Sequence, residues 1–343
     1  MEETFVAFAR EAGRRGHTVE VLGRPPVHPW VARELAACGA IWSPIADVEK
    51  SFVRGSRWLH DNFDVLLYTL LPLRGRLAMQ AAAAWPLQMI YLDETSTPSD
   101  WKRPNALRRL VYRMMHARMA AYACCSEYVR HRGRDVLGLD LSDASVIYNG
   151  VNLERFTPRT SRPAGPPRVM TVLNLIYEKG VDVLVEAFAQ VPVRDAQLIV
   201  AGRGAQLEPL TNQAKALGVG DRVTFLGLRD DVSALLHEAD VFVHPARWHE
   251  AFGYSVAEAM ASGCAVVSTD RGALGELIIH GETGLLVPSE DPVAMAQAIT
   301  RLLTDRPEAE RLGHAARARA EALFSYERAV SDLLALVESA GSR

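Results

Sequence analysis

Short apolar runs and amphipathic stretches alternate along the second half of the chain. Each apolar run has the length of a strand buried in a parallel sheet, and the stretches between them repeat apolar residues at helical spacing. The pattern predicts strands at residues 169–173, 197–201, 222–226, 241–244, 265–268 and 285–287, and helices at 181–190, 207–216, 232–238, 255–262 and 273–278. Asp291 and Pro292 then form an N-cap and first-turn pair that introduces further helices. This alternation specifies an α/β fold with helices on both faces of a parallel sheet.

The first half shows the same alternation with shorter runs. A helix at residues 2–15 precedes a strand at 18–22, and further elements are expected at 31–38, 64–69, 73–84, 87–92, 107–121, 122–126 and 145–148. No strand precedes the first helix, so we expect this domain to lack its opening strand and to expose a sheet edge. Either the start of the coding sequence is placed too late, or this side of the protein is incomplete.

The pattern breaks between residues 149 and 168. Asn149 and Gly150 form a turn signal, and four prolines follow among polar neighbours at positions 158, 163, 166 and 167. The chain has 343 residues, more than the roughly 250–300 that one hydrophobic core usually serves. We predict a first domain at 1–153, a linker at 154–167, a second domain at 168–324 and a final helix within 325–343. The two doubly wound domains are expected to face each other across a cleft.

Composition narrows the possible partners and the compartment. The net charge is −3 and no basic block stands out, which argues against nucleic acid as the main partner. The four cysteines form neither a metal-binding pair nor a disulfide pattern, and no signal peptide opens the chain. The most apolar window, residues 77–92, is shorter than the about 20 residues of a membrane helix and contains a proline. A cytoplasmic location is expected.

One helix of the first half is both basic and amphipathic. Its arginines are Arg103, Arg108, Arg109, Arg113 and Arg118, and its apolar residues are Leu110, Val111, Met114 and Met115. Such a stretch either forms a solvated helix face or rests on an anionic membrane surface. Both interpretations stay open, and the second predicts peripheral contact with the inner face of the cell membrane.

Residues 247–263 hold the candidate chemistry, between two buried strands. Phe252 and Gly253 let the chain turn, and the first amides of a helix that starts near Tyr254 then form a site for an anion such as phosphate. On one helix, Glu250 and Glu258 would lie about 80° and about 12 Å apart, so we place Glu250 on the preceding loop. Glu258 then accepts from a vicinal diol such as a ribose. The alternative for an isolated pair of this spacing is a solvated glutamate beside a helix.

The second half resembles glycosyltransferase family 4 over essentially its whole length. The resemblance is carried by Glu178-Lys179-Gly180-Val181, Ala201-Gly202-Arg203-Gly204, Phe225-Leu226-Gly227, the stretch from Glu250 to Glu258, Gly263, Gly275-Glu276 and the run from Gly281 to Val287. Weaker matches in the first half are Arg15 to Val19, Ser126-Glu127 and Val146 to Val151. The resemblance implies the GT-B fold, retention of the anomeric configuration and a final helix that packs back on the first domain.

The resemblance also implies roles for individual residues. Lys179 binds the diphosphate of a nucleotide-sugar donor, Glu250 contacts the donor sugar and Glu258 binds the ribose. The backbone at Gly204 passes close to the nucleotide at a strand end. The alternative for Lys179 is a surface lysine beside a glutamate. No D-x-D triplet occurs, so we expect lysine and helix dipole, rather than a metal or another cofactor, to neutralise the diphosphate.

Two departures from the family pattern keep other functions open. The neutral Asn174 replaces a second cation expected on the diphosphate, and Asp93 and Glu94 occupy a loop where a first-domain histidine is common. The main hypothesis is a retaining transferase that moves a sugar to an acceptor hydroxyl. The alternative is a catalytically impaired sugar-nucleotide binder or partner subunit, and a GT-B epimerase would need a different acid–base set. The acceptor, the donor nucleotide and the oligomeric state are not specified by the sequence.

Overall fold

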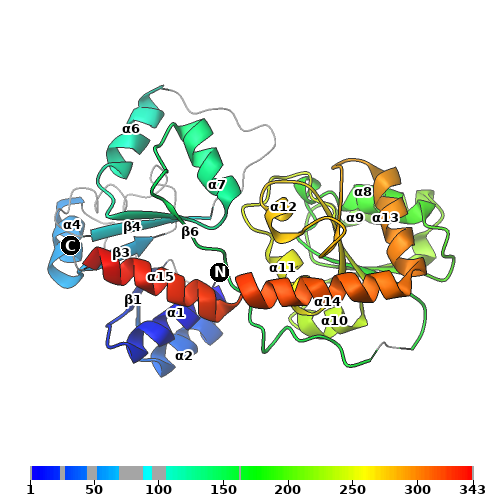
Figure 1. The fold of residues 1–343 in the computed structure, drawn as a ribbon, viewed down its shortest axis with the longest axis horizontal. Helices are drawn as coiled ribbons and strands as arrows, with labels where there is room; N and C mark the ends of the chain where they lie inside the picture. Colours follow the sequence, from blue (N-terminus) through cyan, green and yellow to red (C-terminus); the bar gives the residue numbers. More distant parts are fainter. Residues whose placement is uncertain are drawn as a thin grey trace. The chain divides into compact units, whose positions relative to one another are not determined.

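A computed structural model describes residues 2–23, 28–44, 52–68, 88–94, 106–161 and 164–341 (Figure 1). The chain divides into two compact units. The first holds the described residues up to 94, residues 106–150 and residues 326–341, and the second holds residues 151–325. The predicted element at 73–84 lies outside the described residues.

The second unit is built on a six-stranded parallel sheet. Its strands are β7 (Arg168–Val172), β8 (Gln197–Ala201), β9 (Val223–Gly227), β10 (Val241–His244), β11 (Ala265–Thr269) and β12 (Leu285–Val287), so every predicted strand is present to within one residue. The order β9-β8-β7-β10-β11-β12 is that of a doubly wound nucleotide-binding sheet. In such a sheet the strand order reverses at one point, here between β7 and β10, and ligands bind outside the carboxyl ends of the strands there.

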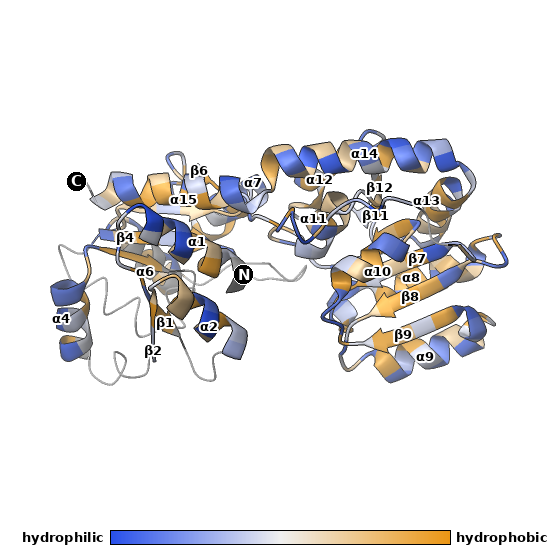
Figure 2. Cartoon of the chain, turned by 90° about the horizontal axis from the view of Figure 1, so that it is seen from below, coloured by the Kyte–Doolittle hydropathy of each residue, from blue (hydrophilic) through white to orange (hydrophobic). Residues whose placement is uncertain are grey.

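Helices cover this sheet and bury its apolar residues. They are α8 (Val181–Gln190), α9 (Leu207–Ala216), α10 (Val232–Glu238), α11 (Tyr254–Ala261), α12 (Leu274–Leu277), α13 (Pro292–Thr304) and α14 (Arg306–Leu323), with short 3-10 turns at Tyr177–Lys179 and Gly220–Arg222. Val169, Leu198 and Val241 of the strands are fully buried in one cluster with Phe188 of α8 and Ile299 of α13. In Figure 2 the strands β7, β8 and β9 are accordingly orange, whereas α9 and α14 carry blue residues.

The first unit contains two parallel sheets, with orders β1-β2 and β3-β4-β5-β6. Its elements are α1 (Glu2–Arg14), β1 (Glu20–Gly23), α2 (Pro29–Ala37), β2 (Ile41–Pro44), α4 (Phe52–Asn62), β3 (Val65–Tyr68), β4 (Gln88–Asp93), α6 (Ala106–His116), β5 (Ala121–Cys124), α7 (Glu127–Arg132), a π-helical turn (Gly133–Leu137), β6 (Ser145–Val146) and α15 (Tyr326–Gly341). The usual order of a doubly wound sheet places its opening strand in the middle. No described strand takes that place, and β1 and β3 are each the edge of a sheet.

Four elements of the first unit were not predicted from the sequence, namely β2, α4, α7 and the π-helical turn after α7, and one predicted helix was too long. The strand β2 has half-exposed residues and ends in a proline, so it lacks an apolar run. The helix α4 contains a glycine, and α7 is only one and a half turns long. The helix predicted at 107–121 ends at His116, because Ala121 already pairs with Ile90 as the first residue of β5.

The final helix, α15, belongs to the first unit. Its Val330 and Leu334 are buried with Ala12 of α1, and its Leu333 is buried with Leu92 of β4. Glu338 of α15 also pairs with Arg15 and His17 at the end of α1. The apolar face of α15 therefore packs against both α1 and the sheet that contains β4.

Candidate active site

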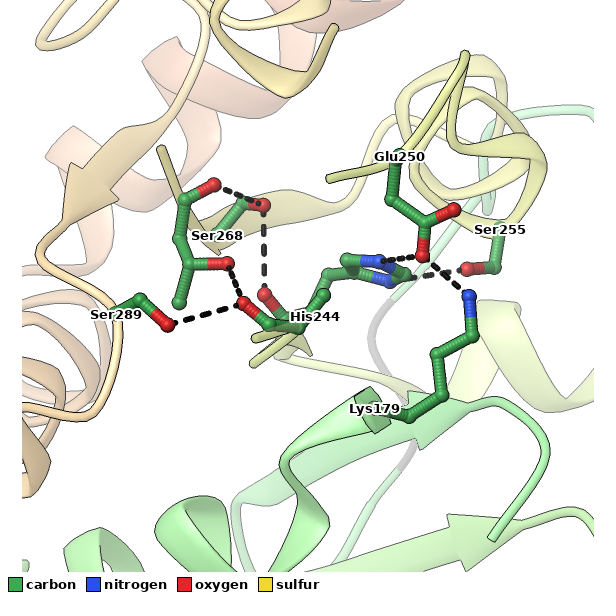
Figure 3. Close-up of polar contacts among 8 residues, drawn as sticks. Lys179, His244, Glu250, Ser255, Ser268 and Ser289 are labelled. Atoms are coloured by element: carbon green, nitrogen blue, oxygen red, sulfur yellow. Dashed lines mark hydrogen bonds and ion pairs between the residues drawn. The ribbon is translucent and has the colours of Figure 1, made fainter. Parts of the chain in front are cut away.

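A lysine and a glutamate meet at the carboxyl edge of the second unit's sheet. Lys179 ends the 3-10 turn that follows β7, and Glu250 lies in the loop that follows β10. Because β7 and β10 are neighbours at the point where the strand order reverses, both loops emerge at the same place. Lys179 Nζ donates a hydrogen bond to Glu250 Oε1 and forms an ion pair with it (Figure 3). The two residues predicted to be catalytic are therefore in direct contact.

Glu250 is buried, and its neighbours keep it ionised. Only 6% of the residue is exposed. Burial acts to raise the pKa of Glu250, but a hydrogen bond with His244 and the positive charge of Lys179 outweigh burial and lower that pKa to about 2. A carboxylate with this pKa does not donate protons near neutral pH, but it does accept hydrogen bonds and stabilise positive charge.

His244, the last residue of β10, connects Glu250 to the helix α11. His244 Nε2 lies 3.3 Å from Glu250 Oε1, and its Nδ1 lies 3.2 Å from Ser255 Oγ (Figure 3). Because an ionised carboxylate only accepts hydrogen bonds, Nε2 donates to Glu250, and Nδ1 lies within hydrogen-bond distance of the Ser255 hydroxyl. The imidazole therefore orients the Glu250 carboxylate.

The sequence analysis assigned no site role to any histidine, but the structure places His244 in contact with Glu250. The position of His244 in the sequence could have indicated this role, because it is the last residue of the buried strand that precedes the Glu250 loop. His280 has a structural contact, because its Nδ1 accepts from Leu286 N at 3.0 Å. His249 is half-buried, and burial together with Arg271 lowers its pKa.

Gly180 allows the lysine turn to lie directly on the glutamate loop. Its φ of 67° is left-handed, and a Cβ atom at this position would lie only 2.2 Å from the Pro245 carbonyl oxygen. A side chain is therefore excluded. Glu250 itself is held from the other side, because its carbonyl oxygen accepts from Ala273 N at 2.9 Å. Loops after β7, β10 and β11 together fix the pair.

The amino end of α11 faces the same edge of the sheet. Gly253 is the N-cap with φ 106°, and no side chain caps the helix. The positive end of the helix dipole is therefore available to an anion there. The ring of Phe252 is buried, in edge contact with Tyr254 and Phe324 at centroid distances of 5.4 and 5.7 Å. The buried Phe252 side chain thus stabilises the turn, so only the main chain of this residue is available to a ligand.

The other predicted site residues lie around this centre. Glu258 is half-buried on the second turn of α11, and Asn174 is exposed in the loop after β7. Gly204 lies in the loop after β8, where a Cβ atom would come within 2.2 Å of the Leu175 carbonyl oxygen. The structure brings Lys179 and Glu250 into contact, and it places these three residues on neighbouring loops and on α11.

The first unit has a buried charge cluster at the end of β4. Asp93 is fully buried and pairs with Arg132 at 3.1 Å, and the Tyr122 hydroxyl donates to Asp93 at 2.9 Å. Asp93 therefore fastens α7 to the sheet. Glu94, the next residue, is half-buried, and its pKa is raised by burial although a hydrogen bond with Asn149 opposes this. Asp93 is thus the last residue of β4 and not part of a loop, and of the two predicted loop residues only Glu94 follows the strand.

The described residues show neither a metal-binding cluster nor a membrane-spanning helix. They contain no group of three or more His, Cys, Asp or Glu side chains arranged to hold a metal ion. None of the helices in the described ranges has both the length and the apolar character needed to cross a membrane.

Two family models match the chain, and together they cover most of it. Residues 154–319 match "Glycosyl transferases group 1", and residues 1–155 match "Glycosyltransferase Family 4". A phosphatidyl-myo-inositol mannosyltransferase of Mycobacterium leprae is 34% identical over 80% of this chain and 72% of its own length. A glycogen synthase of Mycobacterium tuberculosis is 34% identical over 59% of this chain, which spans only half of that enzyme.

Solved structures of low sequence identity share the fold. A glycosyltransferase from Rickettsia africae ESF-5 has a TM-score of 0.86 at 19% identity, over 99% of this chain and 94% of its own. The Anabaena protein Alr3699/HepE, in complex with UDP and glucose, has a TM-score of 0.83 at 19% identity, over 98% and 95% of the two chains. With the family matches, these likenesses show that the chain is a glycosyltransferase of family 4 with the GT-B fold.

Proposed function

We propose that the chain transfers a sugar from a nucleoside-diphosphate sugar to an acceptor hydroxyl, with retention of the anomeric configuration. The observation that carries the proposal is the contact of Lys179 with the buried, ionised Glu250 at the point where the strand order of the sheet reverses. In the reaction, negative charge grows on the leaving diphosphate while the sugar becomes oxocarbenium-like. A fixed cation and a fixed anion at this edge match the two developing charges.

Lys179 and the amino end of α11 are proposed to stabilise the diphosphate. The Lys179 side chain is 20% exposed, so its ammonium can exchange its contact with Glu250 for phosphate oxygens. The exposed Asn174 offers an uncharged amide on the neighbouring loop. Because a lysine and a helix dipole supply the positive charge, the proposed site works without a divalent metal.

Glu250 is proposed to contact the donor sugar and Glu258 the ribose. A carboxylate held ionised by His244 and Lys179 accepts hydrogen bonds from sugar hydroxyls and offsets positive charge on the ring. Glu258 lies further along α11, where its carboxylate can accept from two neighbouring hydroxyls of a ribose. The main chain at Gly204 and Gly253 is proposed to line the nucleotide site.

Nucleotide binding is tested by thermal unfolding with UDP, GDP and ADP, each with and without magnesium. We expect one nucleotide to raise the Tm equally in both conditions, with about 2.7 kcal/mol of added stability at about a hundred times its Kd. Glu258→Ala is expected to reduce this shift, whereas Glu186→Ala, an exposed glutamate of α8, leaves it unchanged. A shift that requires magnesium would contradict the metal-free site, and no shift with any nucleotide would overturn the nucleotide donor.

The second candidate is a sugar-nucleotide binder that no longer catalyses transfer. The neutral side chain of Asn174, at a position where the resemblance implies a cation, favours it. Hydrolysis of the matching nucleotide sugar separates the two functions. A retaining transferase slowly transfers the sugar to water, whereas an impaired binder shows the thermal shift without turnover.

We further propose a cytoplasmic location with peripheral contact to an anionic membrane through α6. Leu107, Leu110 and Met114 are 70%, 54% and 59% exposed and follow a spacing of three and four residues, so they form one stripe. Arg109 and Arg113 lie on the same helix, and the exposed Arg113 donates through Nε to the Gly138 carbonyl oxygen at 2.9 Å. Exposed apolar side chains beside arginines match the interface of an anionic bilayer. The four cysteines are free thiols, which fits a reducing compartment.

The membrane contact is tested by co-sedimentation with phosphatidylglycerol and phosphatidylcholine vesicles. We expect retention on the anionic vesicles at low salt and release at high salt. Leu110→Ser/Met114→Ser is expected to weaken partitioning by about tenfold or more, because each buried apolar side chain contributes about 1.5–3 kcal/mol. Val53→Ser, at an equally exposed residue of α4 (65%), is the control. Equal retention of wild type and the double variant would refute the contact.

A further inference from the structure

Arg247 uses most of its donors to join three loops of the candidate site. Its two terminal nitrogens bind the Asp182 carboxylate at 2.6 and 2.7 Å. Its Nη1 also donates to the Tyr177 carbonyl oxygen at 2.9 Å, and its Nε donates to Glu290 at 3.1 Å. The guanidinium lies over the Tyr177 ring, 4.2 Å from its centroid. Loops after β7, β10 and β12 therefore converge on one side chain.

The same contacts connect the two charged residues of the site through the backbone. Arg247 lies three residues before Glu250, and Tyr177 lies two residues before Lys179. The amides of Arg247 and Trp248 both donate to the Glu178 carbonyl oxygen, at 3.0 and 3.1 Å. The turn that carries Lys179 is thus fastened to the loop that carries Glu250 by main chain and by the Arg247 side chain.

Glu290, the third acidic or carbonyl partner of Arg247, has an unusual backbone conformation. It is the one residue other than glycine, among those described, with a left-handed backbone, at φ 61°. Such a conformation is unfavourable for an ordinary residue and persists where surrounding contacts determine it. The Glu290 carboxylate accepts from Arg247 Nε at 3.1 Å, and this contact joins the loop after β12 to Arg247.

We propose that Arg247 is a positioning residue that holds Lys179 at the place where the diphosphate binds. The proposal rests on the proposed function, because it assigns Arg247 an effect on that same site. The Arg247 side chain is 12% exposed and its charge is already neutralised by Asp182 and Glu290, so it acts on the phosphate through Lys179. A lysine cannot replace it, because an ammonium lacks the planar fork that binds Asp182 through two parallel hydrogen bonds.

The test compares a nucleoside diphosphate with its monophosphate, using the nucleotide that stabilises the wild type. In Arg247→Met we expect the diphosphate Kd to rise about tenfold or more and the monophosphate Kd to change less than twofold. A displacement of about 1 Å at a reacting group costs about a hundredfold in rate, so kcat for the nucleotide sugar is expected to fall by that factor. Arg247→Lys is expected to restore neither value.

Asp182→Ala separates positioning from simple electrostatics. It removes a negative charge near the site, so charge alone would tighten diphosphate binding, whereas loss of positioning weakens it. We expect weaker binding, and we expect Arg247→Met/Asp182→Ala to be no worse than either single variant. Arg222→Met is the matched control: Arg222 also lies over an aromatic ring, Phe188 at 4.9 Å, but at the amino end of β9.

The outcomes distinguish this inference from the proposed function. If the wild type binds a diphosphate and Arg247→Met binds it equally well, only the positioning role is overturned. The same holds if Arg247→Met weakens diphosphate and monophosphate alike, or if Arg222→Met has the same effect, because those results indicate a general loss of structure. If the wild type binds no diphosphate and turns over no nucleotide sugar, the proposed function fails and this role fails with it.

Discussion

Replacing Lys179 by methionine is expected to lower kcat/KM for the nucleotide sugar by about 100- to 1,000-fold. Lys179 Nζ is the cation that contacts Glu250 at the carboxyl edge of the sheet, and the proposed chemistry places developing negative charge beside it. Removing one preorganised group of this kind from a transition state costs about 2.7–4 kcal/mol in other enzymes. Steady-state transfer or hydrolysis rates and the diphosphate Kd measure the effect. We expect the rates to fall and the Kd to rise.

The comparison needs a lysine without a contact at the site. Lys215→Met, at an exposed position near the end of α9, provides it and is expected to keep the wild-type rate. Lys179→Met also leaves Glu250 buried with one partner fewer, so rates must be measured well below the Tm of the variant. A Lys179→Met protein that is folded and retains a rate within about threefold of the wild type would rule out the proposed phosphate contact.

The central strands β10 and β11 of the second unit were predictable because they are buried on both faces. The run at Val241–His244 has no exposed position, and burial of that kind leaves an unbroken apolar signal in the sequence. In the first unit, β2 is half-exposed and ends at Pro44, so neither periodicity nor composition marks it. An unbroken apolar run therefore made the central strands predictable, and β2 lacks such a run.

The candidate site was predictable in its residues but not in its connections. Lys179 and Glu250 follow strands that are separated by two others in sequence, and only the sheet order makes them neighbours. His244 was overlooked because a histidine near a strand end is more often packed or solvated than functional, although its place before the loop of Glu250 was a signal. The contacts of Arg247 with Asp182 and Glu290 span 65 and 43 residues, and no spacing rule predicts such pairs.

Glu250→Gln is expected to lower kcat by about 100-fold or more without weakening the binding of the diphosphate. Glutamine keeps the shape of the side chain and a hydrogen-bond acceptor, but it removes the charge that is proposed to offset the oxocarbenium-like sugar. Lys179 loses its counter-charge at the same time, so the diphosphate Kd is expected to stay equal or to fall. Opposite effects of Lys179→Met and Glu250→Gln on the diphosphate Kd would show that the lysine contacts the phosphates and the glutamate contacts the sugar.

The stability of the wild type and of Glu250→Gln at acid pH tests whether Glu250 is ionised, as its proposed contact with the sugar requires. The pKa of Glu250 falls from its ordinary value of 4.5 to about 2 on folding. A lowered folded-state pKa stabilises the protein above the unfolded pKa, and this stability is lost as the pH falls toward the folded pKa. The difference corresponds to about 3 kcal/mol between pH 4.5 and 2. Denaturant unfolding is expected to show this loss in the wild type and a shallower decline in Glu250→Gln. Equal slopes would mean that Glu250 is not held ionised, and a neutral carboxyl could not stabilise the sugar as proposed.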